Sequence, residues 1–214
     1  LQIELHAIGD KAFDQACRAI KAALDDYPRE DHRHGIIHDC LPTPEGIQIC
    51  RDYHIQMPMQ SAFIGWKQEP DDYLEHILGH DRLEKLNPIK TFRDNDIMVS
   101  FGSDAPCTTP DPIAWMDRAV NNDNAGQAVS VQDALRMCTY NGAWAAFDEQ
   151  ERGSLEAGKI ADMAVLSENP YTVPKDKIKD IRVERLYLSG KSYESCRESI
   201  LPMMLRGLTS RNKA

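Results

Sequence analysis

Short apolar runs and longer amphipathic segments alternate through the first hundred residues. The apolar runs cover residues 1–6, 34–38, 54–58 and 97–101. The segments between them repeat apolar residues at helical spacing, over residues 10–27, 44–53 and about 81–95. Strands that alternate with helices in this way run parallel to one another. The pattern therefore predicts an α/β fold built on parallel strands.

The pattern changes in the second half of the chain. A short helix is predicted at 113–120. A longer one is expected to begin after its N-cap Ser130 and to present one packed face as far as Ala146. Residues 152–193 are rich in turns and contain two strand-like runs, which indicates a small β unit.

These changes divide the chain into three regions. Residues 1–150 form the α/β part, residues 151–193 form the small β part, and residues 194–214 form a tail that we expect to be a fraying helix. The chain begins inside a predicted core strand and without Met, so we expect it to be the C-terminal part of a longer protein.

Composition narrows the classes of partner. The 214 residues carry a formal net charge of −9, which argues against a nucleic-acid or anionic-membrane partner. No apolar stretch approaches the roughly 20 residues that span a bilayer. The six cysteines are scattered, with no CxxC pair, which is typical of reduced thiols in a cytoplasmic protein.

Three polar residues stand where predicted strands end. His6 closes the first run, His38 closes the second, and Asp104 follows the fourth after Gly102-Ser103. The carboxyl ends of parallel strands are where (β/α) barrels place their chemistry. Two imidazoles and a carboxylate are a suitable donor set for a divalent metal such as zinc.

Other candidates carry less specific signals. Phe63 and Trp66 follow the third run, and they either line a substrate pocket or pack within a loop. The remaining histidines are expected to be solvated or to cap helices. Among them, His32 and His34 have the spacing of a metal-binding pair, but they precede their strand and lie at its opposite end.

The chain resembles the C-terminal part of amidohydrolase family 3, which includes N-substituted formamide deformylase-like metal-dependent hydrolases. The resemblance extends to about residue 193. Four motifs carry it: His6-Ala7-Ile8-Gly9-Asp10-Lys11-Ala12, residues 33–38, Phe101-Gly102-Ser103-Asp104-Ala105-Pro106, and Gly153-Ser154-Leu155-Glu156-Ala157-Gly158-Lys159-Ile160-Ala161-Asp162. It implies strands five to eight of a TIM barrel, (β/α)8, and part of a small β-sandwich domain.

The resemblance also implies roles for the strand-end residues. His6 would be the fifth-strand metal ligand, His38 the sixth-strand ligand, and Asp104 the eighth-strand ligand, in a centre of one or two ions. Such a metal lowers the pKa of bound water from its ordinary value toward ~7. Asp104 would then be the catalytic acid and base. The sequence departs from the family at Ile37, Asp39 and Cys40, where Glu, Ala and Gln would be expected.

The function that follows is metal-dependent hydrolysis of an amide-type C–N bond, other than a peptide bond, in a small molecule. Two alternatives remain: a non-catalytic relative that binds a ligand or partner, and a metal-free enzyme in which Asp104 alone acts as base. Half a barrel leaves two strands with free edges. We therefore expect this chain to form a homo-oligomer. We also expect it to be inactive on its own, because it lacks the first-strand ligands and the fourth-strand bridging residue that the resemblance implies.

Overall fold

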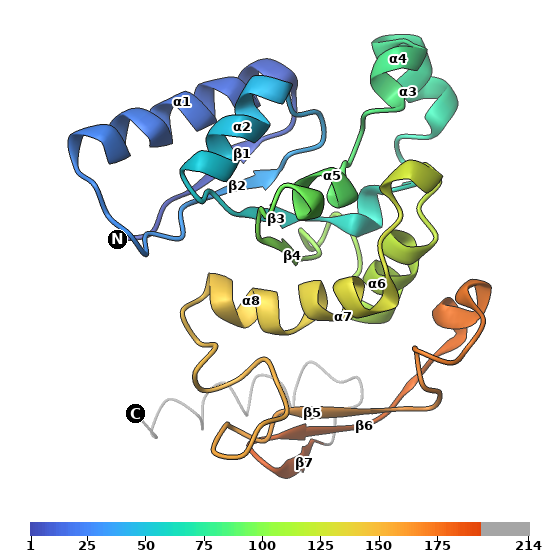
Figure 1. The fold of residues 1–214 in the computed structure, drawn as a ribbon. Helices are drawn as coiled ribbons and strands as arrows, with labels where there is room; N and C mark the ends of the chain where they lie inside the picture. The colour runs from blue at the N-terminus through green and yellow to red at the C-terminus, as the bar shows by residue number, and fades with distance from the viewer. Residues whose placement is uncertain (194–214) are drawn as a thin grey trace, which may run out of the picture.

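The first four strands are parallel and follow one another across a sheet (Figure 1). The computed structural model describes residues 1–193; the predicted tail helix lies outside this part. The strands are β1 (Glu4–Ala7), β2 (Gly35–His38), β3 (Met57–Met59) and β4 (Val99–Phe101). β1 pairs with β2 and β3 pairs with β4, both in parallel. The two pairs are joined where Ile36 N donates to Gln56 O at 3.0 Å.

Helices connect these strands and cover the sheet (Figure 1). The helix after β1 is α1 (Asp10–Asp26), and the helix after β2 is α2 (Pro44–Asp52). α2 begins as predicted, because the Thr43 hydroxyl accepts a hydrogen bond from Gly46 N at 3.0 Å and Pro44 occupies the first turn. The segment after β3 is broken into short pieces: η1 (Ser61–Phe63), α3 (Asp71–Leu78), α4 (His80–Leu83) and α5 (Ile89–Asp94).

The third strand differs from its prediction. It was expected at 54–58 but forms at Met57–Met59, so that it ends one residue later. His54 has a φ of 53°, in the left-handed region, and Ile55 N still bonds to Cys50 O of the preceding helix at 2.9 Å. The turn out of α2 therefore uses residues that resemble a strand in composition.

The long helix predicted after Ser130 is two helices. They are α7 (Val131–Cys138) and α8 (Tyr140–Ala145), and they follow α6 (Pro112–Val120) and the short turn η2 (Ala125–Gln127). Ser130 caps α7 as predicted, accepting from Asp133 N at 3.0 Å. The break falls at Thr139, whose backbone is not helical (φ −129°, ψ −91°) and whose hydroxyl donates to Leu135 O at 2.7 Å.

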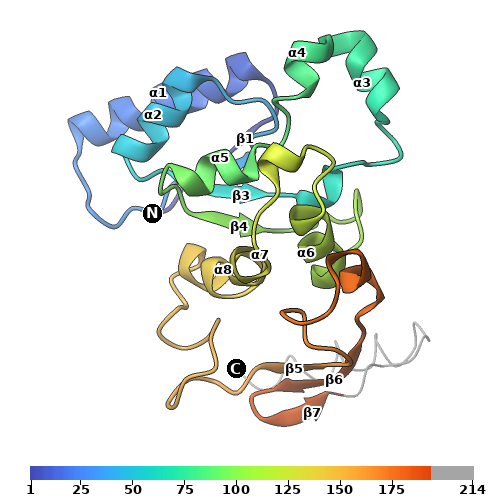
Figure 2. The same ribbon diagram turned by 45° about the vertical axis from the view of Figure 1, so that its right-hand side comes forward.

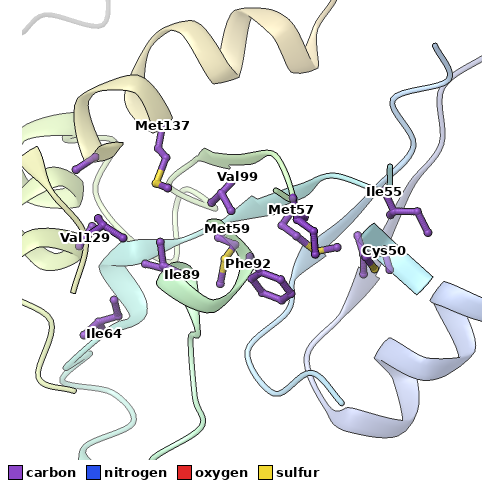
Figure 3. Packing of buried hydrophobic residues seen from close by; sticks show 14 of the residues in the cluster. Cys50, Ile55, Met57, Met59, Ile64, Ile89, Phe92, Val99, Val129 and Met137 are labelled. Carbon is purple, nitrogen blue, oxygen red and sulfur yellow. The ribbon is translucent and has the colours of Figure 1, made fainter. Parts of the chain in front are cut away.

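The hydrophobic core lies between the parallel strands and the helices. Figure 3 shows Met57, Met59 and Val99 of the strands packed beside Phe92 of α5 and Met137 of α7. Each of these side chains is at most 2% exposed. This packing fixes the strands and so fixes the positions of the residues that follow them.

The predicted β unit forms a three-stranded antiparallel sheet. Its strands are β5 (Met163–Leu166), β6 (Val183–Leu188) and β7 (Lys191–Tyr193), in the order β5-β6-β7. Figure 2 shows this sheet beyond α7 and α8, on the side away from the parallel strands. The turn η3 (Lys175–Asp180) attaches it to α6 through buried Ile178, and Asn121 Nδ2 donates to Lys175 O at 2.8 Å.

Two expectations that came from the composition, on membrane-spanning segments and on the cysteines, can be compared with the described residues. No helix within residues 1–193 combines the length and apolar content needed to cross a membrane. The five cysteines in this part are all free thiols, although Cys17 Sγ and Cys50 Sγ lie only 3.4 Å apart between α1 and α2.

Candidate functional site

The predicted site residues lie at one end of the parallel strands. His6 is the third residue of the four-residue strand β1, His38 is the last residue of β2, and Asp104 follows β4 by three residues. Because the strands are parallel, their carboxyl ends form one edge of the sheet. The structure therefore places all three residues at the edge where this class of fold carries its chemistry.

The two imidazoles are in contact. The ring centroids of His6 and His38 are 4.5 Å apart, with the ring planes at 77°. In a regular strand His38 would share a face with Ile36, which packs in the core. A φ of 80° at His38 ends that alternation, so that its ring lies against His6 instead. Such backbone costs of order 1–3 kcal/mol and is concentrated at functional sites.

A fourth residue, Gln60, belongs to the same edge and was missed in the sequence. It directly follows β3, and its Oε1 lies 2.6 Å from His38 Nδ1. An amide oxygen can only accept, so His38 Nδ1 carries the proton and its Nε2 keeps a free lone pair. The sequence did contain a signal for Gln60, because this polar residue directly follows the third strand. It was missed because the predicted strand ended at Pro58.

The environment of His38 keeps its imidazole neutral. Its side chain is buried, and this burial lowers the pKa of His38 below its ordinary value. The hydrogen bond to Gln60 and the Asp104 carboxylate oppose that effect, and His6 adds to it. The neutral form is the one that can act as a metal ligand.

Asp104 is less closely associated with the histidine pair. It is exposed, with a φ of 52°, and its carboxylate acts on His38 through space. Within residues 1–193, no three His, Cys, Asp or Glu side chains are grouped closely enough to hold a metal ion. β1 and β4 are the outer strands, about 14 Å apart along the sheet at three strand spacings. The structure thus brings His6 and His38 together, whereas Asp104 lies at the same edge of the sheet but outside their contact.

Asp39, where the sequence departs from the family pattern, is completely buried. Neither of its carboxylate oxygens has a hydrogen-bond partner among the described residues. Burial raises the pKa of Asp39 well above its usual range, which favours a protonated, neutral carboxyl. Its backbone N donates to Ala7 O at 3.0 Å and ties the end of β2 to the end of β1.

The pair His32 and His34 lies at the opposite end of β2, as expected, but it is not solvated. Both residues are buried. His32 Nε2 lies 2.8 Å from Tyr53 O, and His32 Nδ1 accepts from His34 N at 2.8 Å. The expectation of a solvated role is therefore wrong for these two histidines, whereas the hydrogen bond of His32 to Tyr53 O at the C-terminal end of α2 fits the capping role that was the other expectation.

Comparisons with known proteins identify the family of the chain. The sequence profile of the amidohydrolase family matches residues 1–193. YtcJ of Bacillus subtilis is 25% identical over 202 residues, which are 89% of this chain and 37% of YtcJ. The N-substituted formamide deformylase of Arthrobacter pascens is 32% identical over 152 residues, which are 68% of this chain and 26% of that enzyme.

The fold has counterparts among solved structures. An uncharacterized metal-dependent hydrolase from Pyrococcus furiosus superposes with a TM-score of 0.65 at 27% identity, over 75% of this chain and 32% of that protein. The chain therefore spans about a third of the length of the proteins it matches. The described residues have the α/β architecture of the TIM-barrel type found in these hydrolases. On the family match over residues 1–193, the chain belongs to the amidohydrolase family.

Proposed function

We propose that this chain supplies part of the active site of a metal-dependent hydrolase that cleaves an amide-type C–N bond, other than a peptide bond, in a small molecule. The observation that carries the proposal is the His6–His38 pair, with ring centroids 4.5 Å apart at the carboxyl ends of two parallel strands. Membership of the amidohydrolase family and the similarity to a formamide deformylase support it.

The residues at this edge suit a divalent metal. Gln60 holds the proton of His38 on Nδ1, which leaves Nε2 available as a donor. Imidazole and carboxylate donors favour zinc and related ions. His6 and His38 would hold the metal, with Asp104 as a further ligand once the sheet closes into a barrel. When bound, the metal would act as a Lewis acid toward the substrate carbonyl.

Asp104 has the position of a proton-transfer group. It is exposed at the mouth of the loop after β4, where substrate and water can reach its carboxylate. We assign to it the removal of a proton from the attacking water and the delivery of that proton to the departing nitrogen. In this assignment His6 and His38 would hold the metal, and Asp104 transfers the proton.

We further propose that residues 1–150 are half of a (β/α)8 barrel. In the described structure β1 pairs only with β2, and β4 pairs only with β3. Both outer strands therefore have a free edge on which further strands can be added. The small sheet β5-β6-β7 would likewise belong to a larger β domain.

The test compares Asp104→Asn with wild type in the full-length protein. Metal content and hydrolysis of a panel of small amides are measured together. The variant should keep its metal, because Asn still offers an oxygen, and kcat should fall by about 10²- to 10⁴-fold. Asp72→Asn, on exposed α3, is the matched control and should match wild type.

Two outcomes contradict the proposal. Near-normal kcat in Asp104→Asn with metal bound removes Asp104 from the mechanism. Metal binding by wild type without hydrolysis of any amide favours the non-catalytic relative instead.

A further inference from the structure

A cleft of about 530 Å³ opens beside the candidate site, between the segment after β3 and the segment after β4. Trp66 and Gln68 line one side, and Pro106, Thr109 and Pro110 line the other. None of the residues that line the cleft carries a charge. Its volume lies in the range of small-molecule sites, which are mostly apolar with a few polar groups.

Aromatic contacts connect this cleft to the histidine pair. The ring of Phe63 stacks on His38 with centroids 5.8 Å apart and an interplanar angle of 23°. The ring of Trp66 in turn contacts Phe63, with centroids 5.0 Å apart. Trp66 is thus two ring contacts away from a candidate metal ligand. Of the two roles open for these residues, Phe63 packs on the site and Trp66 faces the cleft.

The opposite wall begins next to Asp104. Ala105 lines the cleft and directly follows Asp104 in the chain. A molecule with one end in the cleft would therefore have its other end at the carboxylate and the imidazoles. This geometry suits a substrate that has a reacting amide at one end and a substituent at the other.

Hydrogen bonds hold both walls in place. The Thr108 hydroxyl donates to Ser103 O, and the Trp115 indole donates to Thr109 O at 3.3 Å. The Ser61 hydroxyl donates to Trp115 O at 2.9 Å, which links the segment after β3 to α6. Residues that are already held in place lose little conformational entropy when a ligand binds.

We infer that this cleft binds an uncharged, flat apolar substituent of the substrate, and that Trp66 is its main specificity-determining residue. The inference rests on the proposed function and names its substrate class. An aromatic or hydrocarbon group would stack on Trp66 and pack against the proline rings, while a charged group would enter a cleft without a partner for it.

The experiment uses three amides that share one acyl group and differ on nitrogen: methyl, 2-phenylethyl, and 2-(4-carboxyphenyl)ethyl. All three release a primary alkylamine, so the leaving groups are comparable. In the full-length protein, Trp66→Ala should lower kcat/KM for the phenylethyl amide about 10- to 100-fold and for the methyl amide less than about 2-fold. Trp66→Phe should recover most of the loss. Tyr73→Ala, which removes an exposed aromatic ring from α3, should change neither.

Binding is measured separately from turnover, so that failure of the inference differs from failure of the proposed function. Calorimetry with metal removed by a chelator should show Trp66-dependent binding of the phenylethyl amide and at least about 10-fold weaker binding of its carboxylated analogue. If all three amides bind and react alike in wild type and Trp66→Ala, the inference is overturned even though hydrolysis stands. If none is hydrolysed but Trp66-dependent binding persists, the cleft assignment is supported and the proposed activity fails.

Discussion

Gln60 and His38 show how one hydrogen bond between neutral side chains can orient a residue that we propose as a metal ligand. The 2.6 Å contact between Gln60 Oε1 and His38 Nδ1 fixes both the tautomer and the direction of the ring. Burial, which lowers the pKa of His38, ensures that the ring is neutral at pH 7. The side chain that orients His38 therefore comes from the residue that directly follows the neighbouring strand β3.

Removal of this hydrogen bond should weaken metal binding. Gln60→Ala leaves His38 free to rotate and to change tautomer, and we expect affinity for Zn²⁺ in the full-length protein to fall about 10- to 100-fold. Gln60→Glu retains an acceptor and should recover affinity, whereas Gln48→Ala, at an exposed position of α2, should match wild type. Calorimetric titration of the metal-free protein measures this. Equal affinities for Gln60→Ala and wild type would show that His38 needs no such support.

At the scale of single residues, the sequence predicts which polar side chains lie at the strand ends. It predicts less well which other side chains contact them. His6, His38 and Asp104 could be selected because each follows an apolar run. The contact between His6 and His38 depends on a positive φ at His38, which no local sequence pattern predicts. Gln60 was missed because the predicted end of the third strand was one residue too early.

Arg33 joins two elements that are far apart in the chain. Its guanidinium lies between the rings of Trp144 and Phe147, at 4.5 and 4.2 Å from their centroids. Two of its nitrogens donate to Glu149, each at 2.8 Å, and its side chain is only 8% exposed. The residues before β2 are thus held against α8 and the segment that follows it.

Loss of the Arg33 partner should destabilise the fold in a pH-dependent way. Glu149→Gln removes one of the two carboxylates that pair with the buried Arg33 guanidinium, Asp31 being the other, and we expect it to cost about 2 kcal/mol at pH 7. The hydrogen bond from Arg33 lowers the pKa of Glu149, so this stabilisation is present above the ordinary Glu pKa and is lost as pH falls through the lowered value. The difference between variant and wild type should therefore shrink below about pH 4.5.

Urea unfolding at pH 7 and at pH 4 measures this effect. Glu151→Gln, an exposed residue two positions away, is the control and should unfold with wild type at both values. A constant difference between Glu149→Gln and wild type across this range would mean that shape, and not charge, holds the junction.

Element boundaries could be predicted where local chemistry decides them. Thr43 and Ser130 cap their helices as expected because the cap is a contact within four residues. The break at Thr139 was not predicted, since residues on both sides keep one continuous apolar spacing. There the orientation of α8 against β4, where Asn141 Nδ2 donates to Val99 O at 2.7 Å, overrides the local preference.

At the scale of the molecule, the parallel strands within residues 1–193 form a sheet that is not closed. Within residues 1–193, β1 and β4 each pair with one other strand. Asn141 covers one carbonyl of β4, and the edge of β1 has no comparable cover in the hydrogen bonds described. Exposed strand edges of this kind recruit further strands. Ile3, beside this edge, is 47% exposed.

The 214-residue chain on its own should therefore associate. Light scattering at tens of micromolar should give a mass well above the 24.2 kDa of one copy, with a dimer that closes eight strands as the simplest form. Ile3→Lys places a charge beside the free edge of β1 and should shift the chain toward monomer. Val183→Lys tests the other exposed apolar surface, because Val183 of β6 has a similar exposure of 52%. If only Val183→Lys dissociates the assembly, the chains associate through the small sheet β5-β6-β7. A stable wild-type monomer would mean that α7 and α8 already protect the edges of the parallel sheet.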